Sequence, residues 1–266
     1  MKRSFLAAVA PVAAAAVVAA PASASEIQVG VTSAAPVVAP ACPAGVSQLE
    51  CKIVLTQVTA LETVRAGVDY PTTVTKAGSI VAFTLGISSL STNRSQVKSD
   101  ISYLNSQYGG DAQAELTVLR PVGKPAYRRW TVAAQSADFH LQPYLGQVVE
   151  FPLPAALPVV PGEALALTVP TWAPVLSFDL TPGKYAYRQS RRSDCGTTPV
   201  LEAQQAIGSS TEYQCDYAGT RVEYSATEVT SPAPTVTDVE HGHRRQAHPN
   251  RVTHGARARD RRRARR

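Results

Sequence analysis

Trp172 is the side chain best placed to bind a ligand by stacking. It stands between Pro170 and Pro174, and two prolines stiffen the segment that carries its indole. Tyr185 and Tyr187 share one face of the next expected strand and would extend the same surface. Aromatic rings of this kind combine a large apolar area with a polar tip. We treat these three residues as candidate ligand-stacking residues, although a tryptophan after a core strand more often closes the end of the hydrophobic core, and that is the interpretation we favour for Trp172.

Three arginines form a second candidate site. Arg188, Arg191 and Arg192 lie close together in the chain, and guanidinium groups pair with carboxylates, sulfates and phosphates through two parallel hydrogen bonds. The segment is therefore a candidate anion contact for a uronate, a sulfate or a teichoic-acid phosphate. The alternative is a solvated loop whose charges are balanced locally by Asp194 and Asp216.

The sequence does not contain a recognisable catalytic set. A Ser-His-Asp triad requires a histidine, residues 26–230 contain only His140, and no nucleophile-elbow motif is present. Asp138 and His140 share a strand face, which we interpret as a solvated strand end. Metal-binding motifs are also missing, so neither a metal nor a cofactor is expected. A hydrolase whose carboxylates converge only in the folded protein remains an alternative.

The four cysteines predict two disulfides, because an exported chain folds in an oxidising compartment. Three pairings are possible, and we favour the local one, Cys42 with Cys51 and Cys195 with Cys215, which closes two short loops. A zinc site is the alternative; the absence of a CxxC pair argues against it.

The N-terminus has the three parts of a secretory signal peptide, which we expect over residues 1–25. Lys2 and Arg3 precede an Ala- and Val-rich run, and Ala22 and Ala24 form a small-residue cleavage site. An N-terminal membrane anchor is the alternative. No later segment has about 18 consecutive apolar residues, so a secreted or cell-envelope protein is expected.

The charge is divided unevenly along the chain, although the formal net charge is +6. Residues 231–266 hold ten arginines and three acidic residues, whereas residues 26–230 hold 14 basic and 17 acidic residues. A mildly acidic domain with a basic tail does not suit a nucleic-acid-binding domain. We expect a disordered tail that tethers the protein to an anionic polymer, binds nothing specific, or results from a shifted reading frame.

Alternating apolar residues predict an all-β fold. Leu165, Leu167 and Val169 give the clearest strand, which we expect the following prolines to end, and residues 78–87 give the next clearest. We count about ten such strands at spacings near ten residues, which favours an antiparallel β-sandwich of jelly-roll type over residues 42–230. A helix is expected over residues 97–108, a short helix or loop over 201–207, and a flexible lead-in over 26–41.

Several segments together resemble a known group of proteins. The segments, in chain order, are VAFTLG at 81–86, YGGD at 108–111, VLR at 118–120 and LTVPTWAP at 167–174. They resemble uncharacterised secreted β-sandwich proteins of high-GC actinobacteria, over roughly residues 50–225. The resemblance implies export, disulfides and a sandwich fold, and it implies no catalytic activity. The Arg-rich residues 240–266 depart from that pattern.

The sequence thus favours a secreted, non-enzymatic extracellular or cell-surface module that binds a glycan or an anionic cell-wall polymer. A secreted hydrolase and a structural envelope protein without a ligand are the alternatives.

Overall fold

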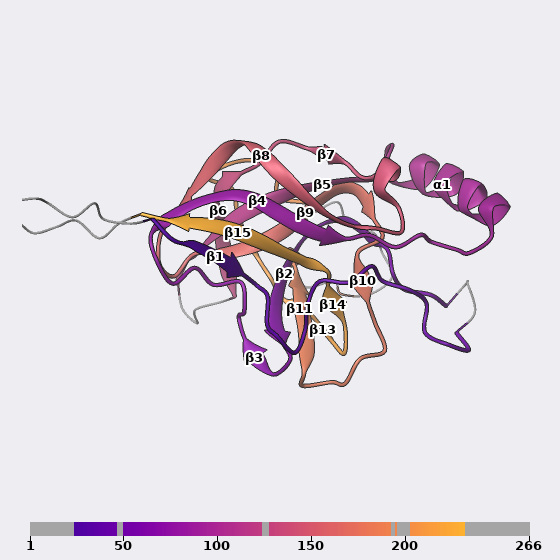
Figure 1. The fold of residues 1–266 in the computed structure, drawn as a ribbon, viewed down its shortest axis with the longest axis horizontal. Helices are drawn as coiled ribbons and strands as arrows, with labels where there is room; N and C mark the ends of the chain where they lie inside the picture. The colour runs from indigo at the N-terminus through magenta and orange to yellow at the C-terminus, as the bar shows by residue number, and fades with distance from the viewer. Residues whose placement is uncertain (1–23, 47–49, 124–127, 193–194, 196–202, 232–266) are drawn as a thin grey trace, which may run out of the picture. The chain divides into compact units, whose positions relative to one another are not determined.

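The computed structural model describes residues 24–46, 50–123, 128–192, 195 and 203–231. These residues form an antiparallel, sandwich-like all-β fold with one α-helix, which confirms the expected fold class (Figure 1). Residues 1–23 of the expected signal peptide and residues 232–266 of the tail lie outside the described residues.

The smaller of the two main sheets has four strands in the order β1-β15-β4-β8. The strands are β1 (Glu26–Val29), β15 (Tyr224–Thr230), β4 (Gly78–Gly86) and β8 (Val148–Val159). Strand β8 forms one edge and contains Pro152, Pro154 and Pro158, which have no amide hydrogen to offer a further strand.

The larger sheet has seven strands along its main path, in the order β12-β6-β5-β9-β2-β11-β13. They are β12 (Ser210–Glu212), β6 (Arg129–Gln135), β5 (Gln113–Pro121), β9 (Ala164–Ala173), β2 (Leu55–Arg65), β11 (Tyr185–Gln189) and β13 (Cys215–Ala218). Short strands complete the fold: β3 (Val68–Asp69) beside β2, β7 (Phe139–His140) beside β5, and the pair β10 (Leu176–Ser177) and β14 (Arg221–Val222).

One continuous segment joins the two ends of the larger sheet. Residues 210–218 pair with β6 through β12 and with β11 through β13. Between the two strands, the Tyr213 amide donates to the Arg128 carbonyl and the Gln214 amide donates to the Arg191 carbonyl. The sheet therefore curls round until its outer strands meet in a single stretch of chain.

Two hydrophobic clusters fill the fold. The larger lies between the two main sheets and includes Phe83, whose ring contacts Phe139 and Phe151. The smaller cluster lies on the other face of the larger sheet, around Trp130 and Tyr213. Alternation along the strands creates both clusters, because successive side chains point to opposite faces.

The clearest predicted strand is present as β9, but it continues through Pro170 to Ala173. We expected the prolines to end it at Val169. Pairing with β2 shifts register at this point, where Gln57 has a positive φ of 48°. This bulge lets the ladder pass a residue that cannot donate a hydrogen bond.

The helix predicted over residues 97–108 is present as α1 (Arg94–Tyr108). The Asn93 side chain caps its first turn by accepting from the Ser95 and Gln96 amides. Gly109 ends the helix in the left-handed conformation, with φ of 85°. A 3-10 turn, η1 (Gln142–Tyr144), is the other helical element described.

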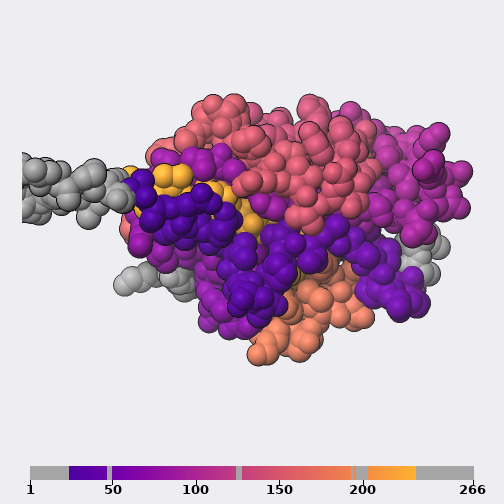
Figure 2. All heavy atoms as spheres, viewed as in Figure 1, coloured from indigo at the N-terminus to yellow at the C-terminus, as the bar shows by residue number. Residues whose placement is uncertain are grey.

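The expected flexible lead-in over residues 26–41 is wrong. Residues Glu26–Val29 form β1 and pair with β15, and the chain after β1 lies across the face of the molecule (Figure 2). Arg221 donates to the Ala35 and Pro36 carbonyls, at 3.2 and 2.5 Å. Gly86 passes so close to the Val38 carbonyl that a Cβ on it would lie 1.8 Å from that oxygen. Composition alone missed these contacts because all of them are with distant parts of the chain.

Candidate functional site

A groove lies beside the β11–β13 ribbon. It has a volume of about 860 Å³ and is walled by the segment before β2, by β10 and the loop after it, and by β13. Most of its walls are apolar, and Phe178, Tyr187 and Tyr217 contribute aromatic rings. A concave, mainly apolar site with a few polar groups is typical of ligand binding.

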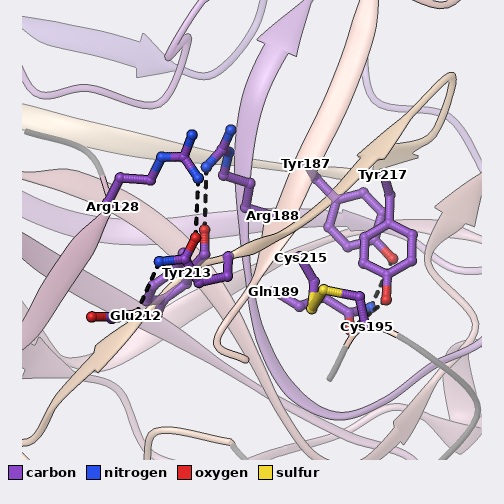
Figure 3. Close-up of a disulfide and its surroundings, with 10 residues drawn as sticks. Arg128, Tyr187, Arg188, Gln189, Cys195, Glu212, Tyr213, Cys215 and Tyr217 are labelled. Atoms are coloured by element: carbon purple, nitrogen blue, oxygen red, sulfur yellow. Dashed lines mark hydrogen bonds between the residues drawn. A yellow bond between two sulfur atoms is a disulfide. The ribbon is translucent and has the colours of Figure 1, made fainter. Parts of the chain in front are cut away.

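Two stacked tyrosines form one wall of this groove (Figure 3). Tyr187 and Tyr217 are directly opposite each other on β11 and β13, with ring centroids 5.0 Å apart and planes inclined by 18°. The Gln189 side chain joins the two hydroxyls. Its Nε2 donates to the Tyr187 hydroxyl at 2.9 Å, and its Oε1 accepts from the Tyr217 hydroxyl at 3.3 Å. Burial raises the pKa of Tyr187 well above its usual range, so its hydroxyl stays protonated. Tyr187 and Gln189 thus hold the half-buried Tyr217 ring in place.

Polar groups stand at the rim of the groove. Glu50, Lys52 and Asp179 are exposed and come from two separate segments. Asp179 has a positive φ of 59°, which places it at a sharp turn after β10. Two carboxylates and one ammonium offer hydrogen bonds to a ligand that lies on the aromatic wall.

Trp172 is a core residue, as the favoured interpretation predicts, and its candidate ligand-stacking role is wrong. Its side chain is 0% exposed and belongs to the core between the sheets. Its indole Nε1 donates to the Asn105 side chain at 2.9 Å and to the Gly110 carbonyl at 3.0 Å. Trp172 therefore packs under the end of α1 and cannot present a ring face to a ligand.

Of the two predicted tyrosines, only Tyr187 lines the groove. Tyr187 lines the groove, but with 2% of its surface exposed it supports the wall rather than forming the contact surface. Tyr185 pairs with Arg65 on β2 and does not line the groove. The exposed ring surface belongs to Tyr217. Tyr217 was not singled out from the sequence, because nothing local in the sequence indicates that β13 pairs with β11.

The predicted anion contact is only partly brought together. Arg188 donates to the Asp216 carboxylate at 3.1 Å and to the Tyr213 carbonyl at 3.3 Å, which agrees with the local balance by Asp216 considered from the sequence. Arg191 is half-buried and Arg192 is exposed. Sequence reasoning missed Arg128, which the fold brings to the same bend in the chain. The other acid considered, Asp194, lies outside the described residues.

Both disulfides have the predicted local pairing, Cys42 with Cys51 and Cys195 with Cys215. The first ties the segment that forms one wall of the groove. The second joins β13 to the chain that leaves β11, close to the tyrosine pair (Figure 3). Each cross-link therefore lies within two residues of a side chain that lines the groove.

A hydrogen-bonded carboxyl pair lies outside the groove. Glu115 on β5 is buried, and its side chain bonds to that of Asp138, while the Gln205 amide donates to it at 3.3 Å. Burial, with the Asp138 carboxylate second, raises the pKa of Glu115 to about 8. The two groups are too close for sugar hydrolysis, which needs carboxyls about 5–10 Å apart. The nearby His140 is exposed and pairs with Gln113 through the backbone.

This pair makes stability depend on pH. Because the pKa of Glu115 in the folded state lies above its usual value of 4.5, folding takes up a proton, and stability falls as pH rises from about 4.5 to about 8. Replacing Glu115 with Gln should flatten the fall by up to about 1.4 kcal/mol per pH unit and stabilise the protein at pH 8.5. Urea unfolding between pH 5 and 9 measures this. Glu26→Gln, at an exposed position, is the control, and equal pH slopes in the two variants would contradict the assignment.

Among the described residues, no three His, Cys, Asp or Glu side chains gather closely enough to hold a metal ion, and no helix is long and apolar enough to cross a membrane.

Comparison with protein-family models, curated proteins and solved structures finds no match to this chain, so the geometry of the groove is the basis for assigning a function.

Proposed function

We propose that this protein is an exported, non-enzymatic binding module, and that the groove beside β11 and β13 takes a carbohydrate of the cell surface or a cell-wall polymer. The observation that carries the proposal is the Tyr187–Tyr217 stack on the groove wall. Sugars present an apolar face to such a ring and hydroxyl groups to polar neighbours. Phe178 and the rim residues Glu50, Lys52 and Asp179 provide the rest of that surface.

The arrangement is already organised for binding. Tyr217 is fixed by its partner ring, by the Gln189 bridge and by the adjacent disulfide at Cys215. A side chain that is held in place loses little conformational freedom when a ligand binds, so more of the contact energy appears as affinity.

The test is a glycan and cell-wall-polymer array, with calorimetry on any hit. We expect Tyr217→Ala to weaken binding by about tenfold or more, because a central aromatic contact is lost. Tyr144→Ala is the matched control, since Tyr144 is an exposed tyrosine of η1 and does not line this groove. Equal affinity in the two variants would move the site elsewhere.

A truncation separates the groove from the basic tail. The described residues, which end at Ser231, belong to one compact unit, so a chain ending at Ala233 is suitable for the same array. Binding that survives truncation and requires Tyr217 supports the proposal. If truncation of the tail alone abolished binding, the basic charge of the tail, and not the groove, would account for recognition. If the full-length protein bound nothing, a structural envelope protein would be favoured.

A hydrolase is the second candidate, because Glu50 and Asp179 bring two carboxyl groups to one groove. Incubating the protein with the polysaccharides it binds, and measuring new reducing ends, separates the two functions. We expect none; reducing ends that disappear in Glu50→Gln or Asp179→Asn would establish the hydrolase instead.

Export makes a prediction about the mature N-terminus. Cleavage after Ala24 would leave Ser25, whose amide donates to Thr230 Oγ1 at 3.1 Å and whose carbonyl accepts from the Thr230 amide at 2.9 Å. This product keeps all of β1. The intact mass of protein from culture medium should therefore begin at Ser25, one residue before the boundary expected from sequence. A chain that keeps residues 1–24, or one that starts after β1, would contradict this.

A further inference from the structure

The bend between β12 and β13 brings together two arginines that are 60 residues apart in the chain. Arg128, just before β6, donates from Nη1 to the Gln214 side-chain oxygen at 3.0 Å. Arg188, on β11, donates from Nη1 to the Tyr213 carbonyl at 3.3 Å. The two acceptors belong to successive residues of the bend, and Figure 3 draws the two guanidinium groups next to each other in its view of this bend.

The backbone holds this arrangement in place. The Tyr213 amide donates to the Arg128 carbonyl at 2.8 Å, so the bend is fixed to the start of β6. Strand pairing places Arg188 opposite Asp216 and fixes the other side of the bend to β11. The pair therefore belongs to the closure of the curled sheet and does not depend on a chance meeting of two long side chains.

The local charge favours an anion. Asp216 bonds to Arg188 at 3.1 Å, but Arg128 has the neutral Gln214 as its partner, and Gln214 in turn donates to Glu212. In the part of the chain that the structure describes, positive charges exceed negative ones around the bend. The cations are Arg128, Arg129, Arg188, Arg191 and Arg192, and the acids are Glu212 and Asp216.

We propose that Arg128 and Arg188 together bind an oxyanion group, either a planar carboxylate or a tetrahedral sulfate or phosphate ester. Two neighbouring guanidinium groups repel each other, and an anion that bridges them removes that repulsion and accepts paired hydrogen bonds from each fork. Arg128 is exposed and the Arg188 side chain is 15% exposed, so both are accessible to a group on an extracellular polymer.

This site is independent of the groove. Tyr187 and Arg188 are successive residues of β11 and therefore point to opposite faces of the sheet. Loss of groove binding would leave the oxyanion site intact, and the reverse also holds.

The experiment is a titration of the mature full-length protein with sodium sulfate, inorganic phosphate and trigalacturonate, monitored by NMR of the arginine Nε–Hε signals. We expect the Arg128 and Arg188 signals to shift and saturate together, and affinity to fall as ionic strength is raised with sodium chloride. Which of the three probes binds tightest identifies the oxyanion class.

Charge-matched variants test the assignment. Arg128→Gln should weaken binding about tenfold, because a charge-assisted hydrogen-bond pair is lost, and Arg128→Lys should recover only part of it. Arg94→Gln on α1 and Arg263→Gln in the tail remove the same charge elsewhere and should leave affinity unchanged. Arg128 is exposed, so its replacement does not threaten the fold. Equal weakening in all three Gln variants, or shifts confined to other arginines, would overturn the proposal.

Discussion

Trp172→Ala should lower the free energy of unfolding by about 3–5 kcal/mol. The indole is wholly buried between the sheets, so its removal leaves a cavity that the surrounding strands cannot fill. It also removes both hydrogen bonds that join β9 to the end of α1, at Asn105 and at Gly110. Urea denaturation monitored by far-UV circular dichroism measures the change, and some of the helical signal should be lost first.

Two comparisons separate packing from binding. Trp172→Phe keeps most of the volume and loses the hydrogen bonds, so it should cost only about 1–2 kcal/mol. Ligand affinity in the groove should be unchanged wherever the Ala variant is still folded. If a Trp172 variant had normal stability but no longer bound the ligand, Trp172 would have the stacking role after all.

Arg65→Met should destabilise the protein by about 3–5 kcal/mol at pH 8, because it leaves a buried carboxylate without its partner. Arg65 and Glu62 are both wholly buried and form an ion pair, with Arg65 Nε donating to Glu62 at 2.9 Å. Arg65 also donates to the Tyr224 and Val222 carbonyls, at 2.8 and 3.2 Å. The pair thus fastens β2 to the chain around β14 and β15.

The pH dependence identifies charge as the cause. Burial raises the pKa of Glu62 from 4.5 to about 7, although Arg65 lowers it, so stability falls as pH rises through that window. Without Arg65 the pKa rises further, and the fall continues above pH 7. The cost of the substitution should therefore be larger at pH 8 than at pH 5, where Glu62 is neutral in both proteins.

Two control variants separate the charge from the packing. Arg94→Met, at an exposed position, should have little effect, and the double variant Glu62→Leu with Arg65→Met should recover part of the loss. A destabilisation of equal size at both pH values would show that packing around Arg65 is responsible, rather than the unpaired charge.

Local pattern was enough to predict β9 and α1, but not β1. The alternating residues Leu165, Leu167 and Val169 are buried in β9. The apolar residues Val97, Ile101, Leu104 and Tyr108 follow one another at intervals of four, three and four positions, and they lie in α1. Both signals arise within a few residues of chain, where backbone geometry alone fixes which side chains share a face. The local disulfide pairing was accessible for a related reason, since short loops are the easiest to close.

The candidate site could not be derived in the same way. Tyr217 forms the groove wall only because β13 pairs with β11, and Arg128 meets Arg188 only because the chain from β12 to β13 crosses between two sheet ends. These are long-range pairings with no local signature. The opposite error occurred at Trp172, where flanking prolines suggested a loop although a bulge in β2 lets the strand continue.

The way the sheets end bears on how the protein behaves when it is concentrated. Exposed strand edges are where protein chains add to one another and begin to aggregate. Here the outer strands of the larger sheet meet in residues 210–218, and β8, the long edge of the smaller sheet, is interrupted by Pro152, Pro154 and Pro158. The opposite edge, β1, is only four residues long. Among the described strands, then, no long and regular edge is offered to a second copy, so a fold made mostly of strands is protected against edge-to-edge polymerisation.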